Sequence, residues 1–95
     1  MKKEKNKLEY RKLERIVKGF ANHRRLQVLE LLSKEPELSV QEISERLKSE
    51  FKNISAHINK MAIAGLVMKR SDSKSVRHKL TNRGNVILKF VRMLE

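Results

Sequence analysis

Apolar residues recur at helical spacing in the first third of the chain. From Leu8 onward the pattern is helical, with Leu13, Ile16, Val17 and Phe20 at positions i, i+3, i+4 and i+7, which predicts a first helix that ends or bends at Gly19. Asn22 is a suitable N-cap for a second helix, and Pro36 ends that helix in a polar turn. The second helix has a wide apolar face, so we expect it to lie at the centre of the fold.

Two more helices follow the turn. Ser39, with Glu42 three residues later, has the pattern of a capping box, which predicts a third helix over residues 40–48. After a short break, the apolar spacing predicts a fourth helix over residues 51–64, and Gly65 follows where a left-handed residue commonly ends a helix. The expected inner face of this fourth helix consists of Phe51, Ile54, Ile58 and Met61.

The period then changes from helical to alternating. Residues 66–68 begin a strand, residues 71–75 have the composition of a turn, and residues 76–80 have the pattern of a second strand. Thr81 is the expected N-cap of a last helix. Two short helices followed directly by a hairpin predict a winged helix-turn-helix, a mainly α fold with a small β-hairpin wing in the order α-α-α-α-β-β-α.

Charge is distributed unevenly along the chain. The sequence has 23 Lys and Arg against 11 Asp and Glu, a net charge of +12. Residues 1–18 hold eight basic and three acidic groups, and residues 52–95 hold ten basic and two acidic groups, whereas the middle of the chain is nearly neutral. This distribution favours a polyanionic partner over a surface charged only for solubility. We expect residues 1–7 to form a flexible basic tail and residues 8–95 to form the folded domain.

The fourth helix is the candidate recognition helix. No carboxylate occurs from Phe51 to Ser71, whereas an ordinary amphipathic surface helix, the alternative interpretation, usually mixes Glu with Lys. Asn side chains suit adenine, and Lys side chains suit guanine or phosphate. The candidate DNA-contacting residues of this helix are Lys52, Asn53, Ser55, Ala56, His57, Asn59 and Lys60.

The hairpin supplies a second set of candidate contacts. They are Lys69, Arg70, Lys74, Ser75 and Arg77. Because alternate residues of a strand face opposite sides, only some of these side chains can reach DNA. We favour Arg70, Lys74 and Arg77, on the phosphate backbone or in the minor groove.

Four stretches of sequence, taken in order, resemble the ArsR-type winged-helix repressors. They are GFANHRRLQVLELL from Gly19, LSVQEISERL from Leu38, NISAHINKMAIAGLV from Asn53 and KRSDSKSVRHKLTNRG from Lys69. They are similar to the family's opening helix, the first helix of its helix-turn-helix, its recognition helix, and its wing with the start of the last helix. The resemblance covers about residues 13–94 and implies a dimeric DNA-binding regulator of transcription.

The metal sites of the resembled family are not matched. The positions of its paired Cys ligands correspond here to Ser39 and Gln41, and the Asp, His and Glu ligands of its last helix are replaced by Asn85, Lys89 and Arg92. None of these side chains suits a soft metal. We therefore expect no metal ion and no cofactor.

The three histidines and the acidic residues do not suggest a catalytic site. His23, His57 and His78 lie in three different predicted elements, so contact with DNA or exposure at the surface is favoured over zinc. The acidic residues lie mostly on helix surfaces, and three scattered glycines form no phosphate loop. Without Cys the chain fits a reducing compartment, and no apolar run approaches the roughly 20 residues of a membrane span. We expect a cytoplasmic protein that is not an enzyme and does not bind membranes.

The two terminal helices have more apolar residues than a small domain can bury. The candidate dimer-interface residues are Leu8, Leu13, Ile16, Val17, Ile87, Phe90, Val91 and Leu94. Pairing these helices across a two-fold axis would place two recognition helices about 34 Å apart, one turn of DNA. The alternative is that the two helices pack on each other within one chain.

Taken together, these features predict a homodimeric, sequence-specific regulator of double-stranded DNA, acting most simply as a repressor. Two alternatives stay open at this stage. One is a sequence-neutral architectural protein that binds DNA or RNA through its charge alone. The other is a winged domain that binds a protein partner.

Overall fold

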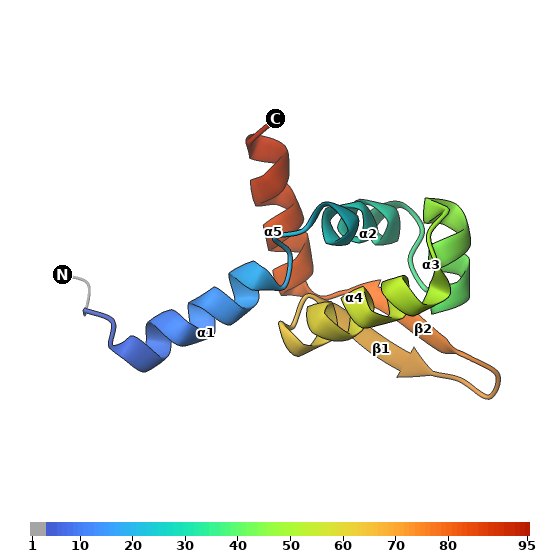
Figure 1. The fold of residues 1–95 in the computed structure, drawn as a ribbon, viewed down its shortest axis with the longest axis horizontal. Helices are drawn as coiled ribbons and strands as arrows, with labels where there is room; N and C mark the ends of the chain where they lie inside the picture. The colour runs from blue at the N-terminus through green and yellow to red at the C-terminus, as the bar shows by residue number, and fades with distance from the viewer. Residues whose placement is uncertain (1–3) are drawn as a thin grey trace.

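The computed structural model describes residues 4–95 and forms the predicted winged helix-turn-helix (Figure 1). Within these residues, five helices and one antiparallel hairpin follow each other in the expected order. Their bounds are α1 (Lys7–Lys18), α2 (His23–Lys34), α3 (Val40–Leu47), α4 (Phe51–Ile63), β1 (Val67–Ser71), β2 (Val76–Leu80) and α5 (Asn82–Met93).

The predicted helix caps are confirmed. The Oδ1 of Asn22 accepts hydrogen bonds from two backbone N–H groups at the start of α2, and the Thr81 hydroxyl accepts one at the start of α5. Ser39 and Glu42 form the complete capping box of α3. Gly65 has a φ of +78° just after α4, a conformation that costs a glycine little. Elements whose ends are fixed by local side chains are therefore found where the sequence predicts them.

The hydrophobic core lies where α2, α3 and α4 meet the hairpin. Its fully buried members include Val28 and Leu29 of α2, Ile43 of α3, and Ile54 and Ile58 of α4. The helix α2 is central, as expected, because it contacts α3, α4, α5 and β2. This core holds α4 in place while leaving the opposite face of α4 free.

Two expectations about individual residues are wrong. Phe51 is 57% exposed rather than part of the inner face of α4. Phe51 is the first residue of α4, and Ile54 is the first residue of that helix to be buried. Because helical side chains lean toward the N-terminus, the Phe51 ring extends beyond the buried part of the helix. His78 is 1% exposed rather than at the surface or on DNA. Strand alternation points it inward with Leu80, and its Nδ1 lies 2.9 Å from the carbonyl oxygen of Leu38.

The helix α1 extends away from the core, whereas α5 packs against α2 and buries Leu88 (Figure 1). No residue of α1 is buried, and α1 begins at Lys7, one residue earlier than expected. Only the C-terminal end of α1 approaches the rest of the domain, where Ile16 packs against the core. The single chain therefore does not bury the two terminal helices against each other.

Candidate nucleic-acid interface

The polar face of α4 is open to solvent. The inner face of the helix buries Ile54, Ile58 and Met61, so the opposite face points to solvent. The candidate contacts Lys52, Asn53, Ala56, Asn59 and Lys60 are exposed, and Ser55 and His57 are half-buried. The structure thus brings all seven predicted residues of α4 to one exposed face that has no carboxylate. Phe51 adds an exposed aromatic ring at the N-terminal end of this face, which sequence reasoning missed.

Arg25 of α2 fixes the position of His57. Its Nε donates a hydrogen bond to Nδ1 of His57 at 3.0 Å, and its Nη1 donates to the carbonyl oxygen of Lys18 at 2.6 Å. Burial and then the positive charge of Arg25 lower the pKa of His57. His57 is therefore neutral at pH 7, accepts at Nδ1 and keeps its proton on Nε2. No sequence signal identifies Arg25, since 32 residues separate it from His57.

Lys69 connects the base of the wing to α4. Its Nζ donates a hydrogen bond to Oδ1 of Asn59 at 2.5 Å. Lys69 lies opposite His78 in the hairpin register, on the face that turns toward the core. This bond uses one of the two acceptor positions of the Asn59 amide oxygen, and the amide NH₂ stays available as a donor.

The wing arginines are held by carboxylates. Arg70 and Arg77 lie opposite each other in the hairpin and share one face. Arg70 pairs with the carboxylate of Glu37 at 2.8 Å, and Arg77 donates to the backbone oxygen of the same residue at 3.1 Å. Nε of Arg77 also pairs with Asp72 at 2.7 Å.

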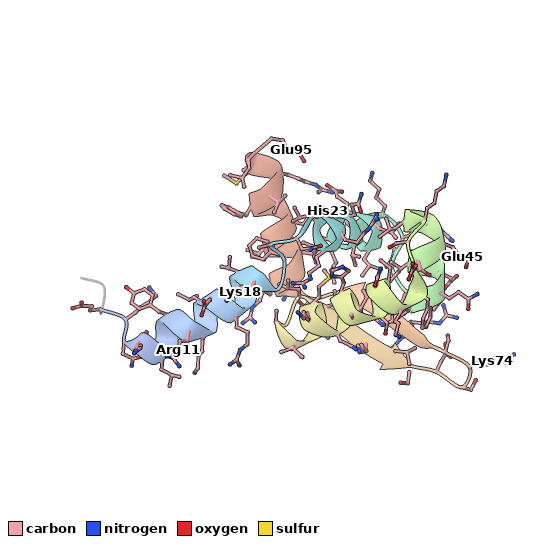
Figure 2. The ribbon with its side chains drawn as sticks, in the orientation of Figure 1. Arg11, Lys18, His23, Glu45, Lys74 and Glu95 are labelled. Atoms are coloured by element: carbon pink, nitrogen blue, oxygen red, sulfur yellow. The ribbon has the colours of Figure 1, made fainter. Side chains whose placement is uncertain are left out.

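Asp72 shapes the tip of the wing. Its Oδ1 accepts hydrogen bonds from the backbone N–H groups of Lys74 and Ser75, each at 2.9 Å. The hydrogen bond from Arg77, and then these two backbone donors, hold the pKa of Asp72 well below its usual range. The Lys74 side chain is exposed at the far end of the wing, as its label shows in Figure 2. Of the three favoured wing residues, Lys74 is thus the one whose charge is not paired within residues 4–95.

A second exposed surface is apolar and lies on the terminal helices. Of the eight predicted interface residues, five are exposed: Leu8, Leu13, Val17, Phe90 and Leu94. The other three, Ile16, Ile87 and Val91, are half-buried. Tyr10, Val86 and Met93 extend this surface and were not among the predicted residues.

The described residues contain no group of three His, Asp or Glu side chains arranged to hold a metal ion. Arg92, at one of the positions that correspond to the resembled family's metal ligands, instead forms a two-bond ion pair with Glu30 at 2.8 and 3.1 Å. This pair ties α5 to α2. None of the helices in residues 4–95 is long and apolar enough to cross a membrane.

The model of the arsR family of bacterial regulatory proteins matches residues 22–69, from the N-cap of α2 into β1. The chain belongs to the ArsR family. It is therefore a DNA-binding regulator of transcription, and both its family and its fold are those of regulators rather than enzymes.

Solved structures share the whole fold of this ArsR-family chain. HlyU from Vibrio cholerae is 30% identical with a TM-score of 0.78, and the match covers 94% of this chain and 97% of HlyU. The homodimeric winged helix-turn-helix domain Mb0332 of Mycobacterium bovis is 23% identical with a TM-score of 0.83, over 99% of this chain and 89% of that one. The transcriptional repressor PagR of Bacillus anthracis is 21% identical with a TM-score of 0.77, over 90% and 99%. No curated protein sequence matched the chain.

Proposed function

We propose that this ArsR-family regulator binds a specific double-stranded DNA site as a homodimer and represses transcription in the cytoplasm, without a metal ion or cofactor. The helix α4 (Phe51–Ile63) enters the major groove, and the wing, residues 68–79, contacts the backbone or the minor groove. The observation that carries the proposal is the exposed, carboxylate-free face of α4, which is held in place by Arg25.

The proposed contacts divide into two groups. Asn53, Ser55, His57 and Asn59 read base edges, with Phe51 and Ala56 available for the methyl group of thymine. Lys52, Lys60, Lys69 and Lys74 contact phosphates and supply affinity without sequence choice. Arg70, Ser75 and Arg77 orient the wing, and the two arginines reach phosphate when DNA displaces their carboxylate partners. The basic residues 1–7, predicted as a tail, add further phosphate contacts; Lys7 is the first residue of α1, and Met1–Lys3 lie outside the described residues.

The homodimer forms through α1 and α5. These helices hold most of the exposed large apolar side chains of the described chain, and a solvated protein rarely leaves such a surface open. The homodimeric Mb0332 domain supports a homodimer, and the repressor PagR supports the direction of regulation. The two-fold axis would place two recognition helices one DNA turn apart.

A footprint on DNA tests this function. Hydroxyl-radical cleavage of the region upstream of the protein's own gene should show two protected stretches about 10 base pairs apart, centre to centre. A single protected stretch would contradict the dimer. Uniform weak protection along the whole fragment would instead favour the second candidate, a sequence-neutral architectural DNA- or RNA-binding protein, which the net charge of +12 supports.

A further inference from the structure

A basic groove of about 500 Å³ lies between α1 and α4, and its α1 residues are not among the contacts proposed so far. It is lined from three helices: Arg11, Arg15 and Lys18 of α1, Arg25 of α2 and Lys60 of α4. Glu14 is the one acidic side chain of the lining, and it pairs with Lys18 at 3.2 Å. Neither Arg11 nor Arg15 has a carboxylate partner within residues 4–95. The groove therefore carries a large unbalanced positive charge.

The groove continues onto the recognition surface. Arg25 and Lys60 also line a smaller neighbouring pocket, which they share with Asn53, Ala56 and His57 of α4. Lys18 lies where α1 meets the rest of the domain, and Arg11 lies farther out along the same helix (Figure 2). A DNA strand that leaves the outer face of α4 beside Arg25 and Lys60 would therefore pass directly along α1.

The helix α1 presents two different faces. Arg11, Arg15 and Lys18 are spaced four and three residues apart, so they share one face. The apolar residues Leu13 and Val17 fall on the other side of the helix. The side of Leu13 and Val17 is thus available for a second protomer, while the groove side stays open for a charged ligand. The predicted interface residue Leu8 lies three residues before Arg11 and seven before Arg15, so it falls on the groove side.

Two occupants of the groove are considered, a second copy of this chain and a phosphate backbone, and the positive charge of the groove favours the second. A second copy of this chain, with a net charge of +12, would be repelled by it. A phosphate backbone is attracted, and it is the ligand that the adjoining face of α4 is proposed to bind. We infer that the groove holds the DNA backbone next to the major-groove site, with Arg11 and Arg15 each neutralising a phosphate. This inference rests on the proposed DNA-binding function and adds α1 to its contact surface.

The test compares salt dependence among matched variants of the full chain. Arg11→Gln/Arg15→Gln removes two groove charges from exposed positions. Lys34→Gln/Lys89→Gln removes the same charge from exposed positions that do not line the groove. The affinity for a duplex from the protein's own upstream region and for a scrambled duplex is measured by fluorescence anisotropy between about 50 and 200 mM salt. Circular dichroism melting curves check that each variant is folded.

The groove variant should lose about tenfold or more in affinity at about 0.1 M salt, equally on both duplexes. Its slope of log K against log salt should become shallower by about 1.8 for each bound protomer, because each phosphate contact contributes about 0.9. The Lys34/Lys89 control should keep the wild-type slope. Glu14→Gln removes the only carboxylate of the groove lining and the partner of Lys18. This variant should bind DNA several-fold more tightly, with a steeper slope of log K against log salt.

Other outcomes distinguish a failure of the groove contact from a failure of the proposed function. If the groove variant and the control have the same slope while wild type binds DNA, the groove contact is wrong and the proposed function stands. If wild type does not distinguish the two duplexes but the slope still changes, site-specific regulation is wrong and the groove contact stands. If inorganic pyrophosphate shifts the Gly19 amide signal of wild type, but not of a groove variant whose DNA slope is unchanged, a free phosphate compound occupies the groove and the inference is overturned.

Discussion

Arg25 and His57, from helices that are far apart in the sequence, form a direct hydrogen bond from Nε to Nδ1 at 3.0 Å. Through its second bond to the Lys18 carbonyl, Arg25 links α1, α2 and α4. The bond requires an unprotonated Nδ1 on His57, so the guanidinium both positions the ring and sets its protonation state. A residue of the central helix α2 thus fixes the position of His57 on the face of α4 that is proposed to contact DNA.

This relationship predicts a change in the pKa of His57. Burial is the larger cause of its lowered pKa, and the charge of Arg25 is the next. Replacing Arg25 with Gln should raise the pKa of His57 toward its ordinary value without fully restoring it, while His78 is unaffected. A titration followed by NMR of the imidazole signals measures both. An unchanged pKa of His57 would contradict the contact.

His78 predicts a loss of stability in mild acid. Burial lowers its pKa in the folded chain. As the pH falls below about 6.5, the unfolded chain takes up this proton first, so the free energy of unfolding should decrease, whereas above that pH the group contributes no pH dependence. Urea unfolding at pH 7 and pH 5 should show the difference.

His78→Leu is the control for this effect. It should reduce the difference between the two pH values, leaving the part due to His57, whose pKa is also lowered. The Leu38 carbonyl keeps a partner in this variant, because the backbone N–H of residue 78 also donates to it. An undiminished difference would show that other groups cause the acid sensitivity.

Asp72→Asn should strengthen DNA binding. Asn can still accept the backbone N–H groups of Lys74 and Ser75, so the turn is kept, but the ion pair with Arg77 is lost. Arg77 then becomes available to phosphate, and we expect several-fold tighter binding to any duplex by fluorescence anisotropy. Weaker binding would show that the wing needs Arg77 in its paired position.

Because the exposed residues of the proposed interface on α1 and α5 are apolar, we expect a charge placed among them to disrupt the dimer. Phe90→Glu places a carboxylate at this interface and should shift the protein to a monomer in sedimentation equilibrium, with a loss of cooperative DNA binding. Met68→Glu is the matched control for sedimentation alone, because Met68 is similarly exposed on β1 but lies in the wing that is proposed to contact DNA. A Phe90→Glu protein that sediments as wild type does would contradict the proposed interface.

The fold was predictable because its signals are local. The caps at Asn22, Ser39 and Thr81 and the left-handed Gly65 each act within a few residues, so the sequence alone places them. The seven candidate residues of α4 could likewise be assigned to one face, because helical periodicity determines which side chains share it.

The details of the site were not predictable because they depend on distant partners. His78 meets Leu38 across 40 residues and Arg70 meets Glu37 across 33, and neither pairing leaves a mark on local sequence. The exposure of Phe51 depends on where the core ends rather than on periodicity. The basic groove likewise depends on the angle at which α1 leaves the core.

The measurement that tests the central claim most directly compares Asn53→Ala with Lys74→Ala on the upstream and scrambled duplexes. Wild type should prefer the upstream site by about 10³ or more at about 200 mM salt. Asn53→Ala should lose about 1–3 kcal/mol on the upstream duplex only, whereas Lys74→Ala should weaken both duplexes alike and flatten the salt dependence. Equal binding of wild type to both duplexes, or equal effects of the two substitutions on both, would contradict sequence reading by α4.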